Sequence, residues 1–268
     1  MSFTEIRHDP VVFLAAPELN CGAAVHGFST RIGGVSRPPR DTLDLRASSA
    51  DTPEVRENFR RFCAAVGADY DRMVFSKQVH RDDVRLVTGA DAGTGIFRER
   101  DYEADGLITN EPGLPLVIFS ADCIPVLLHD PVRHAIGACH AGWRGTALGI
   151  AAKTVRRMTE EFGTDPADLR CAIGPGISRC CFETDGDVPQ AMLAALGDKA
   201  CDFIDDHGTG KYHVDLKGIN HRWLASAGVK SENIAVSDEC TVCFPHRYFS
   251  HRVLGAERGS MAAIIQLV

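Results

Sequence analysis

The sequence predicts a globular protein that combines β-strands with amphipathic helices. Its 268 residues are 44% hydrophobic and 24% charged, which is ordinary for a chain with a large apolar core. Two short apolar runs, Leu116–Phe119 and Ile124–Leu128, have the length of buried strands, whereas Val55–Gly67 carries apolar residues at helical spacing and ends in glycine. With no repeat, low-complexity tract or flexible linker, residues 1–268 are expected to form one unit.

The remaining elements are expected in the following order. Strands over 73–80 and 82–89 follow the first helix and place His80 near a strand end. The polar residues 120–123 separate the two apolar runs, as in a single buried strand interrupted at a site. A strand over 135–139 then leads to His140.

A second helix is expected after His140, capped by Thr146 and ended by Gly163. One apolar face of this helix would consist of Leu148, Ala151, Val155, Met158 and Phe162. His140 would therefore lie at a turn from strand to helix.

Charge and hydropathy limit the partners. A formal charge of −7 provides no basic field for a nucleic acid. The first residues are not expected to act as a signal peptide, and no stretch is long enough to predict a span of a bilayer. Ten cysteines without an export signal indicate reduced thiols or metal ligands. We expect a cytoplasmic protein that acts on small molecules without membrane or nucleic-acid partners. The protein is expected to be a monomer or a dimer.

Three residues are candidates for catalysis or metal binding: His80, Cys123 and His140. They are too far apart in sequence for a zinc finger and suit ligands gathered from separate strands. Asp122 is either a carboxylate that orients a metal-bound water or a histidine, or one that caps a turn. Gln78, two residues before His80 on the same face of a strand, is a candidate substrate contact.

Three glycine-rich turns are candidates for an anion pocket. One places Arg31 beside a glycine pair at positions 33–34, one places Arg144 between Gly142 and Gly145, and one spans residues 171–181. Glycines allow a ligand to approach the backbone closely, and the start of a helix presents free N–H groups to an anion. The dinucleotide pattern GxGxxG is absent.

The other cysteines are expected to be packing residues. Cys240 and Cys243 form a CxxC pair, and a four-thiolate zinc site with Cys180 and Cys181 is conceivable, but the spacing does not favour it. Cys139 should point away from His140 into the core, because neighbouring residues of a strand face opposite ways.

Several segments together resemble the YfiH family, also called the laccase-domain or multicopper polyphenol oxidase family. The resemblance covers nearly the whole chain and rests on FSTRIGGVS, KQVH, EADGLITN, SADCIPVLLHD, HAGWRGT, IGPGISRCCFE, KYHVDL and CTVCFPHRYFSHR. It implies an α+β fold, layered α/β/β/α with mixed sheets. It also implies a zinc site made by His80, Cys123 and His140.

The resemblance further implies a purine nucleoside phosphorylase that acts on adenosine, inosine, guanosine or methylthioadenosine, with adenosine deaminase side activity. A zinc ion with three protein ligands keeps a position open for water activation, which suits deamination. Phosphorolysis needs phosphate as co-substrate, held by cations and N–H groups. Arg31, Lys77 and Arg144 are the expected phosphate contacts.

Two alternatives stay open. Copper could replace zinc at the same ligands and produce laccase-like activity, although no HxH motif is present for a multicopper centre. Alternatively, Cys123 could be the nucleophile and His140 the base of an amidase in peptidoglycan editing.

The chain also departs from the family pattern. Asp44 and Arg46 replace the usual Asn and Gly, and one C-terminal basic residue near Arg252 and Arg258 is shifted or missing. These changes are expected to alter contacts in the pocket.

Overall fold

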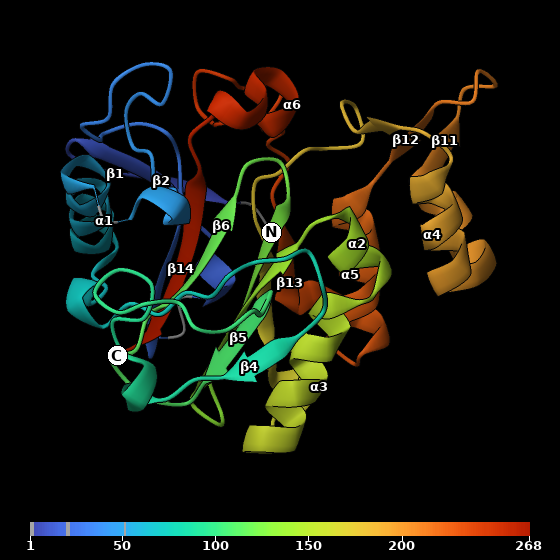
Figure 1. Ribbon diagram of the computed structural model, residues 1–268. Helices are drawn as coiled ribbons and strands as arrows, with labels where there is room; N and C mark the ends of the chain where they lie inside the picture. The colour runs from blue at the N-terminus through green and yellow to red at the C-terminus, as the bar shows by residue number, and fades with distance from the viewer. Residues whose placement is uncertain (1–2, 20–21, 51) are drawn as a thin grey trace.

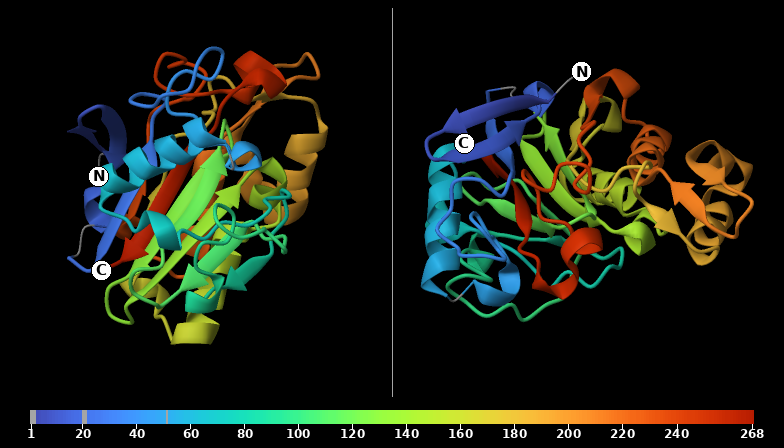
Figure 2. Two further views of the ribbon diagram at one scale, coloured as in Figure 1. Left: turned by 60° about the vertical axis from the view of Figure 1, so that its left-hand side comes forward. Right: turned by 90° about the horizontal axis from the view of Figure 1, so that it is seen from above.

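Two β-sheets stacked face to face between helices form the body of the protein. The computed structural model describes residues 3–19, 22–50 and 52–268. Figures 1 and 2 show the sheets at the centre, with α1 (Pro53–Val66) covering one side and α3 (Ile150–Phe162) and α5 (Leu216–Ser226) the other. This arrangement confirms the expected α+β fold with α/β/β/α layers.

The first sheet is antiparallel and has the order β1-β2-β3-β14-β6. Its strands are β1 (Thr4–His8), β2 (Val11–Ala15), β3 (Ala24–Ser29), β14 (Met261–Leu267) and β6 (Leu116–Ser120). The C-terminal strand β14 thus lies in the interior of the sheet, where it joins the N-terminal strands to the middle of the chain (Figure 1).

The second sheet is mixed and has the order β13-β9-β7-β8-β5-β4. Its strands are β13 (Ile234–Val236), β9 (Arg170–Ile173), β7 (Ile124–Asp130), β8 (Ala135–Ala141), β5 (Gly106–Thr109) and β4 (Val84–Leu86). The two outer pairs are parallel and the three inner pairs antiparallel. The central strands β7 and β8 are buried along their whole length, because helices cover one face and the first sheet the other.

The apolar side chains divide into three cores that follow the layers. One core lies between the two sheets and contains Ile118 and Leu127. The residues next to these in sequence face outward: Val117 packs with helix α1 and Val126 with α3 and α5. Successive side chains of a strand point to opposite faces of the sheet, so each strand contributes apolar side chains to the cores on both faces.

Helix α1 (Pro53–Val66) confirms the first expected helix. Phe59 and Phe62 are buried against the first sheet, and Gly67 ends the helix with a left-handed φ of 82°. A side chain other than glycine is disfavoured at that φ, so the residue stops the helix there.

The two apolar runs around residues 120–123 do not form one interrupted strand. They are β6 and β7, which belong to different sheets. Asp122 has a φ of 87°, and the chain turns at this residue from one sheet to the other. The polar turn therefore lies at the junction of the two sheets.

The expected strand over 73–80 is also wrong. This segment makes only isolated bridges, Val74 with Leu116 and Lys77 with Glu103, and His80 has a left-handed φ of 61°. Only the second strand of the expected pair is present, as β4. Because His80 is left-handed, the segment cannot continue as an extended strand at this residue.

The helix after His140 is divided. A short α2 (Trp143–Ala147) and α3 (Ile150–Phe162) meet at Gly149, and Gly142 is the N-cap of α2. Thr146 therefore lies inside α2 and is not a cap. Leu148 is exposed because it falls at the break, whereas Ala151, Val155 and Met158 face the core and Gly163 ends α3 as expected.

The rest of the chain flanks this body. A small antiparallel sheet, β10-β12-β11, projects to one side with α4 (Figure 1). The remaining elements are β10 (Glu183–Thr184), β11 (Ile204–Asp206), β12 (Tyr212–Val214), α4 (Asp187–Leu196), α5 (Leu216–Ser226) and α6 (His251–Leu254).

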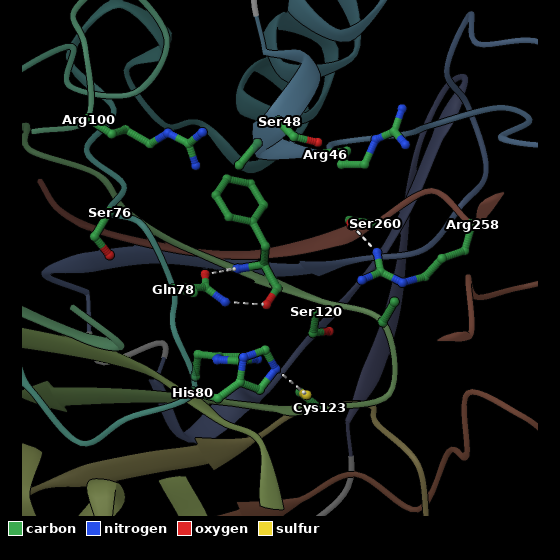
Figure 3. A pocket seen from close by; sticks show the side chains of 14 residues that line it. Arg46, Ser48, Ser76, Gln78, His80, Arg100, Ser120, Cys123, Arg258 and Ser260 are labelled. Carbon is green, nitrogen blue, oxygen red and sulfur yellow. Dashed lines mark hydrogen bonds between the residues drawn. The ribbon is translucent and has the colours of Figure 1, made fainter. Parts of the chain in front are cut away.

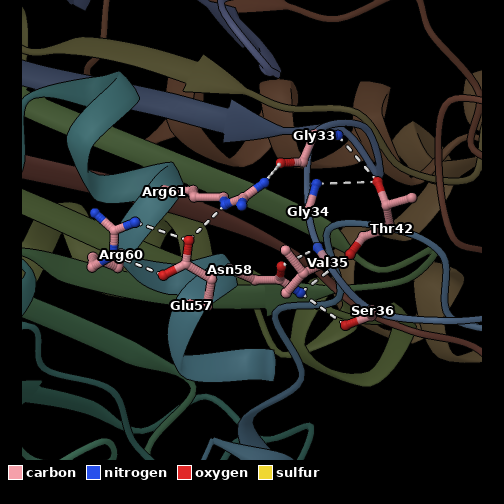
Figure 4. A network of polar contacts seen from close by, with 9 residues as sticks. All are labelled: Gly33, Gly34, Val35, Ser36, Thr42, Glu57, Asn58, Arg60 and Arg61. Atoms are coloured by element: carbon pink, nitrogen blue, oxygen red, sulfur yellow. Dashed lines mark hydrogen bonds and ion pairs between the residues drawn. The ribbon is translucent and has the colours of Figure 1, made fainter. Parts of the chain in front are cut away.

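The glycine-rich loop after β3 is fastened to α1. Asn58, which is fully buried, accepts from the N–H of Val35 and donates to the carbonyl oxygen of Thr42 (Figure 4). It also donates to the carbonyl oxygen of Asp44. The amides of Gly33 and Gly34 both donate to the hydroxyl of Thr42. The loop is therefore closed on itself and leads on to Arg46.

Candidate active site

Strand pairing brings Cys123 and His140 together. Cys123 immediately precedes β7, and His140 is the residue before the last of β8. Because β7 and β8 are antiparallel, with Pro125 opposite His140, the start of one strand lies beside the end of the other. His80 reaches the same place from the loop before β4.

The three expected ligands converge on one point. The Sγ of Cys123 lies 3.8 Å from Nε2 of His80, and the rings of His80 and His140 are 4.8 Å apart at an angle of 81°. One ligand atom from each residue lies within 4.8 Å of the other two. A cluster of two imidazoles and one thiolate is a donor set that zinc accepts.

Asp105 fastens the cluster and is a residue that sequence reasoning missed. Its Oδ1 lies 2.7 Å from Nδ1 of His140, and its carboxylate accepts the backbone N–H groups of Val79, His80 and Arg81. One fully buried carboxylate thus orients one histidine ring and holds the loop that carries the other. The available signal was an acidic residue directly before β5 in the EADG segment.

Gly142 leaves the space that the cluster needs. A Cβ at this position would lie 2.8 Å from Cδ2 of His80 and 3.2 Å from Sγ of Cys123. The first separation is below any normal carbon contact, so a larger residue would push the ligands apart. Gly142 is therefore required because the side chains of His80 and Cys123 lie close to its backbone.

The cluster favours a thiolate beside an imidazolium. Burial opposes ionisation of Cys123, but the charge of His140 and hydrogen bonds from both histidines lower the pKa of this thiol to about 6. Burial likewise opposes protonation of His140, but the Cys123 thiolate and Asp105 raise the pKa of the imidazole to about 9. A pre-formed thiolate is the state that binds metal or attacks an electrophile.

Two cavities meet at this cluster, and His80, Ala121, Cys123 and Arg258 line both. The first, of about 290 Å³, is the more polar and is seen in Figure 3. Its other polar side chains are Arg46, Ser48, Ser76, Gln78, Arg100, Ser120, His140 and Ser260.

The second cavity, of about 370 Å³, has aromatic and aliphatic walls formed by Trp143, Ile177, Phe182 and Leu216. Arg144, Arg252 and Arg258 line it as well. The cluster therefore stands between two cavities that are lined by three arginines each, with Arg258 shared. The first, which also has serine hydroxyls in its walls, is named the arginine-rich cavity, and the second, which has more aromatic and aliphatic wall, the apolar cavity.

The side chains of Gln78 and Asp122 hydrogen-bond to other residues of the protein. Gln78 lines the first cavity, but its amide accepts from the N–H of Phe119 and donates to the carbonyl oxygen of the same residue (Figure 3). Asp122 accepts from the hydroxyls of Thr241 and Ser250 and from the N–H of Arg252. Of the two roles expected for Asp122, these contacts favour the turn-capping carboxylate, and Asp105 orients the histidine instead.

The structure separates the three expected phosphate contacts. Arg144 borders the second cavity, with its guanidinium 4.2 Å from the ring centre of Trp143. Lys77 has an exposed side chain, and neither cavity includes it.

Arg31 also lies outside both cavities. Its guanidinium donates to the carbonyl oxygens of Asp41 and Pro245. The sequence suggested that three glycine-rich turns form one anion pocket. The loop of Arg31 does not join the other two turns in such a pocket.

The departures from the family pattern contact each other. The buried carboxylate of Asp44 accepts the backbone N–H groups of Arg46 and Ser260. Arg258 donates to the hydroxyl of Ser260 and lines both cavities. The positions that differ from the usual pattern therefore contribute Arg46 and Arg258 to the arginine-rich cavity.

The remaining cysteines were predicted only in part. Cys139 is fully buried in the core, as expected. The expectation that the other four are packing residues is wrong for Cys180 and Cys243, which are exposed. Together with Cys181 and Cys240 they place their sulfur atoms within 4.8 Å of one another.

Fold and site together define a layered α/β/β/α protein with a cluster of two histidines and one cysteine at the junction of its sheets. Residues 25–268 match the family described as "Multi-copper polyphenol oxidoreductase laccase". The chain therefore belongs to this family, which includes YfiH and YlmD.

Curated relatives share about a third of their residues with this chain. It is 35% identical to "Purine nucleoside phosphorylase YlmD" of Bacillus subtilis over 90% of this chain and 87% of the relative. It is 36% identical to "Purine nucleoside phosphorylase YfiH" of Escherichia coli over 90% and 92% of the two chains.

Solved structures agree with the fold. The protein YfiH of Bacillus licheniformis, titled hypothetical, superposes with a TM-score of 0.91 at 35% identity, over 98% of this chain and 99% of that one. YlmD from Geobacillus stearothermophilus superposes with a TM-score of 0.90 at 33% identity, over 99% and 98%. Among the described residues, no helix combines the length and apolar character needed to cross a bilayer.

Proposed function

We propose that the protein is a zinc-dependent purine nucleoside phosphorylase. Its substrates would be adenosine, inosine, guanosine or methylthioadenosine, with deamination of adenosine as a side activity. The observation that carries the proposal is the position of the cluster of two histidines and one cysteine between two arginine-lined cavities, of which the apolar cavity also has aromatic and aliphatic walls. The names of the relatives, purine nucleoside phosphorylases, support the same activity.

The proposed zinc ligands are His80, Cys123 and His140. Their donor set suits zinc, and Gly142 leaves room for the ion where a Cβ would obstruct the ligands. Bound there, zinc would supply a Lewis acid with one open coordination position. Asp105 supports the site because its bond to Nδ1 of His140 leaves Nε2 of that ring as the coordinating nitrogen.

The arginine-rich cavity is the proposed phosphate site. Arg46, Arg100 and Arg258 line it together with serine hydroxyls, so it combines cations with neutral donors. In phosphorolysis a phosphate oxygen bonds to C1′ while the bond from C1′ to the base nitrogen breaks, and that electron pair leaves with the purine. Guanidinium groups fixed around the phosphate hold it for attack without becoming protonated or deprotonated themselves.

The apolar cavity is the proposed site for the base. Trp143 and Phe182 offer aromatic faces, and Ile177 and Leu216 complete an apolar wall. Aromatic stacking suits a purine ring, and burial of its apolar faces contributes to binding. With the base on one side and phosphate on the other, the ribose would lie near the cluster.

The test is base release from adenosine and inosine, with and without phosphate, on samples of measured zinc content. We expect phosphate-dependent release of adenine and hypoxanthine, lost together with zinc in Cys123→Ala. Cys201→Ser is the matched control, because this exposed cysteine lies outside the cluster. Full phosphorolysis by a Cys123→Ala protein without zinc would overturn the zinc assignment, and copper in active wild-type protein would favour laccase-like activity.

A second candidate is supported by one arrangement in the site. Cys123, His140 and Asp105 form a series of thiolate, imidazole and carboxylate, as in a cysteine hydrolase. An amidase acting on peptidoglycan precursors would use the same atoms without metal. Turnover of an amide by zinc-free protein, and its loss in Cys123→Ser, would favour this candidate over the phosphorylase.

A further inference from the structure

A second cluster of possible metal ligands lies apart from the candidate active site. It consists of Cys180 and Cys181, which follow β9, and of Cys240 and Cys243, which follow β13. Neighbouring parallel strands lead to the two segments, since β13 pairs with β9 in the second sheet. The topology therefore explains why cysteines so far apart in sequence meet.

The separations among three of the sulfur atoms match those around a single zinc ion, and Sγ of Cys240 lies within 4.8 Å of these three. The Sγ atoms of Cys180 and Cys181 are 3.6 Å apart, those of Cys180 and Cys243 3.7 Å, and those of Cys181 and Cys243 3.5 Å. Four sulfurs each about 2.3 Å from a zinc ion in a tetrahedron would be about 3.8 Å from one another. A disulfide would instead bring two of them to about 2.0 Å, and these cysteines are free thiols.

Backbone N–H groups hydrogen-bond to Sγ of Cys240, the fourth sulfur, as is typical of a thiolate ligand. The N–H of Ser178 donates to Sγ of Cys240 at 3.3 Å, and the N–H groups of Val242 and Cys243 also hydrogen-bond to that sulfur. Amide donors from the turn of a CxxC pair stabilise negative charge on its first sulfur.

A buried cation accompanies the cluster. Lys217 is 4% exposed, and its Nζ donates to the hydroxyl of Ser178 and to the carbonyl oxygens of Ser237 and Glu239. A zinc ion with four thiolates has a net charge of −2, so a fixed cation beside the segment stabilises the charged form.

We propose that Cys180, Cys181, Cys240 and Cys243 bind a second, structural zinc ion. Four protein ligands leave no open coordination position, which is typical of zinc that stabilises a fold. The inference does not depend on the proposed phosphorylase activity.

The ion would tie together two walls of the apolar cavity. Ile177 and Phe182 of the first segment line that cavity, and so does Arg252, which follows the second segment. Arg252 also donates to the carbonyl oxygen of Cys181 at 3.3 Å. Zinc at the cysteines would therefore fix the position of the cavity walls without contacting substrate.

The test is the zinc content of the full chain, purified under reducing conditions without chelator and measured by native mass spectrometry. We expect two zinc ions per wild-type chain and one in Cys123→Ala. We likewise expect one in Cys243→Ser, which alters an exposed ligand, and two in the control Cys201→Ser. A single ion in the wild type that disappears in Cys123→Ala would overturn the proposal.

A second measurement keeps all four cysteines intact. X-ray absorption at the zinc edge of Cys123→Ala is expected to show only sulfur neighbours at about 2.3 Å. Nitrogen or oxygen neighbours would contradict the four-thiolate site. So would a disulfide among these cysteines in protein kept under reducing conditions, or iron in place of zinc.

Discussion

Oδ1 of Asp105 lies 2.7 Å from Nδ1 of His140, while the same carboxylate accepts three successive N–H groups from Val79 to Arg81. Asp105 therefore couples β8 to the loop of His80. Hydrogen bonding to the His140 ring and to the backbone lowers the pKa of this carboxyl despite its burial. The carboxylate stays ionised and holds both histidines in place.

The first prediction concerns this coupling. Asp105→Asn should lower zinc affinity about 10- to 100-fold, because an amide cannot support the His140 ring and three N–H groups as a carboxylate does. Zinc affinity would be measured by competition with a chelator. Asp130→Asn is the control, since Asp130 is equally buried and accepts from Val132 and Arg133 far from the cluster. Equal zinc affinities in the two variants would contradict the role of Asp105.

The second prediction concerns the space at Gly142. Gly142→Ala should abolish zinc binding and turnover, because its Cβ would lie 2.8 Å from His80 and 3.2 Å from the Cys123 sulfur. Zinc content and base release would be measured on folded protein. Gly186→Ala is matched to it, since the added Cβ there would have only Tyr212 nearby, at 3.9 Å. Wild-type zinc binding by Gly142→Ala would show that the ligands tolerate the methyl group.

The third prediction distinguishes two proposed phosphate contacts: Arg31, which was expected from sequence, and Arg100, which lines the arginine-rich cavity. Arg100→Gln should raise the KM for phosphate about tenfold or more, since a hydrogen bond to a charged group contributes about 1.5–3 kcal/mol. Arg31→Gln should leave that KM unchanged but lower the Tm, because Arg31 bonds to Asp41 and Pro245. The KM for phosphate of each variant would be measured from initial rates over a range of phosphate concentrations. A raised KM in Arg31→Gln and an unchanged KM in Arg100→Gln would indicate that Arg31 contacts phosphate.

The fourth prediction concerns stability at acid pH. Burial lowers the pKa of His26 to about 4, and its Nε2 accepts the N–H of Ala16. The unfolded chain, with an ordinary histidine pKa of about 6.5, binds a proton between these values while the folded chain does not. Stability from this residue is therefore complete above pH 6.5 and falls by up to about 3 kcal/mol as the pH approaches 4.

Urea unfolding of wild-type protein and His26→Gln across pH 4–7 measures this effect. Glutamine can accept from Ala16 but does not titrate, so the variant should lose less stability on acidification. Parallel pH curves for the two proteins would assign the acid sensitivity to other groups, such as His129, whose pKa burial also lowers.

Local patterns in the sequence were sufficient for several elements. The apolar spacing of residues 55–66 and the glycine at 67 predicted α1, because helix periodicity and a left-handed stop are local properties. The layered fold was available from the family resemblance. The three candidate ligands were singled out because histidine and cysteine stood among small and polar residues.

Only the tertiary structure decided which residues meet. It assigned residues 116–120 and 124–130 to different sheets, since strand length and hydropathy do not specify a partner strand. The pairing of β5 with β8 places Asp105 against His140. Arg46, Arg100 and Arg258 line the first cavity, whereas Arg31 does not. The fold also brings the four cysteines Cys180, Cys181, Cys240 and Cys243 together. The sequence alone determined which chemical groups the chain carries. The distances between these groups were determined by long-range strand pairing and by the φ of Asp122 and His80. These distances depend on contacts between segments that are far apart in the chain, which local patterns do not specify.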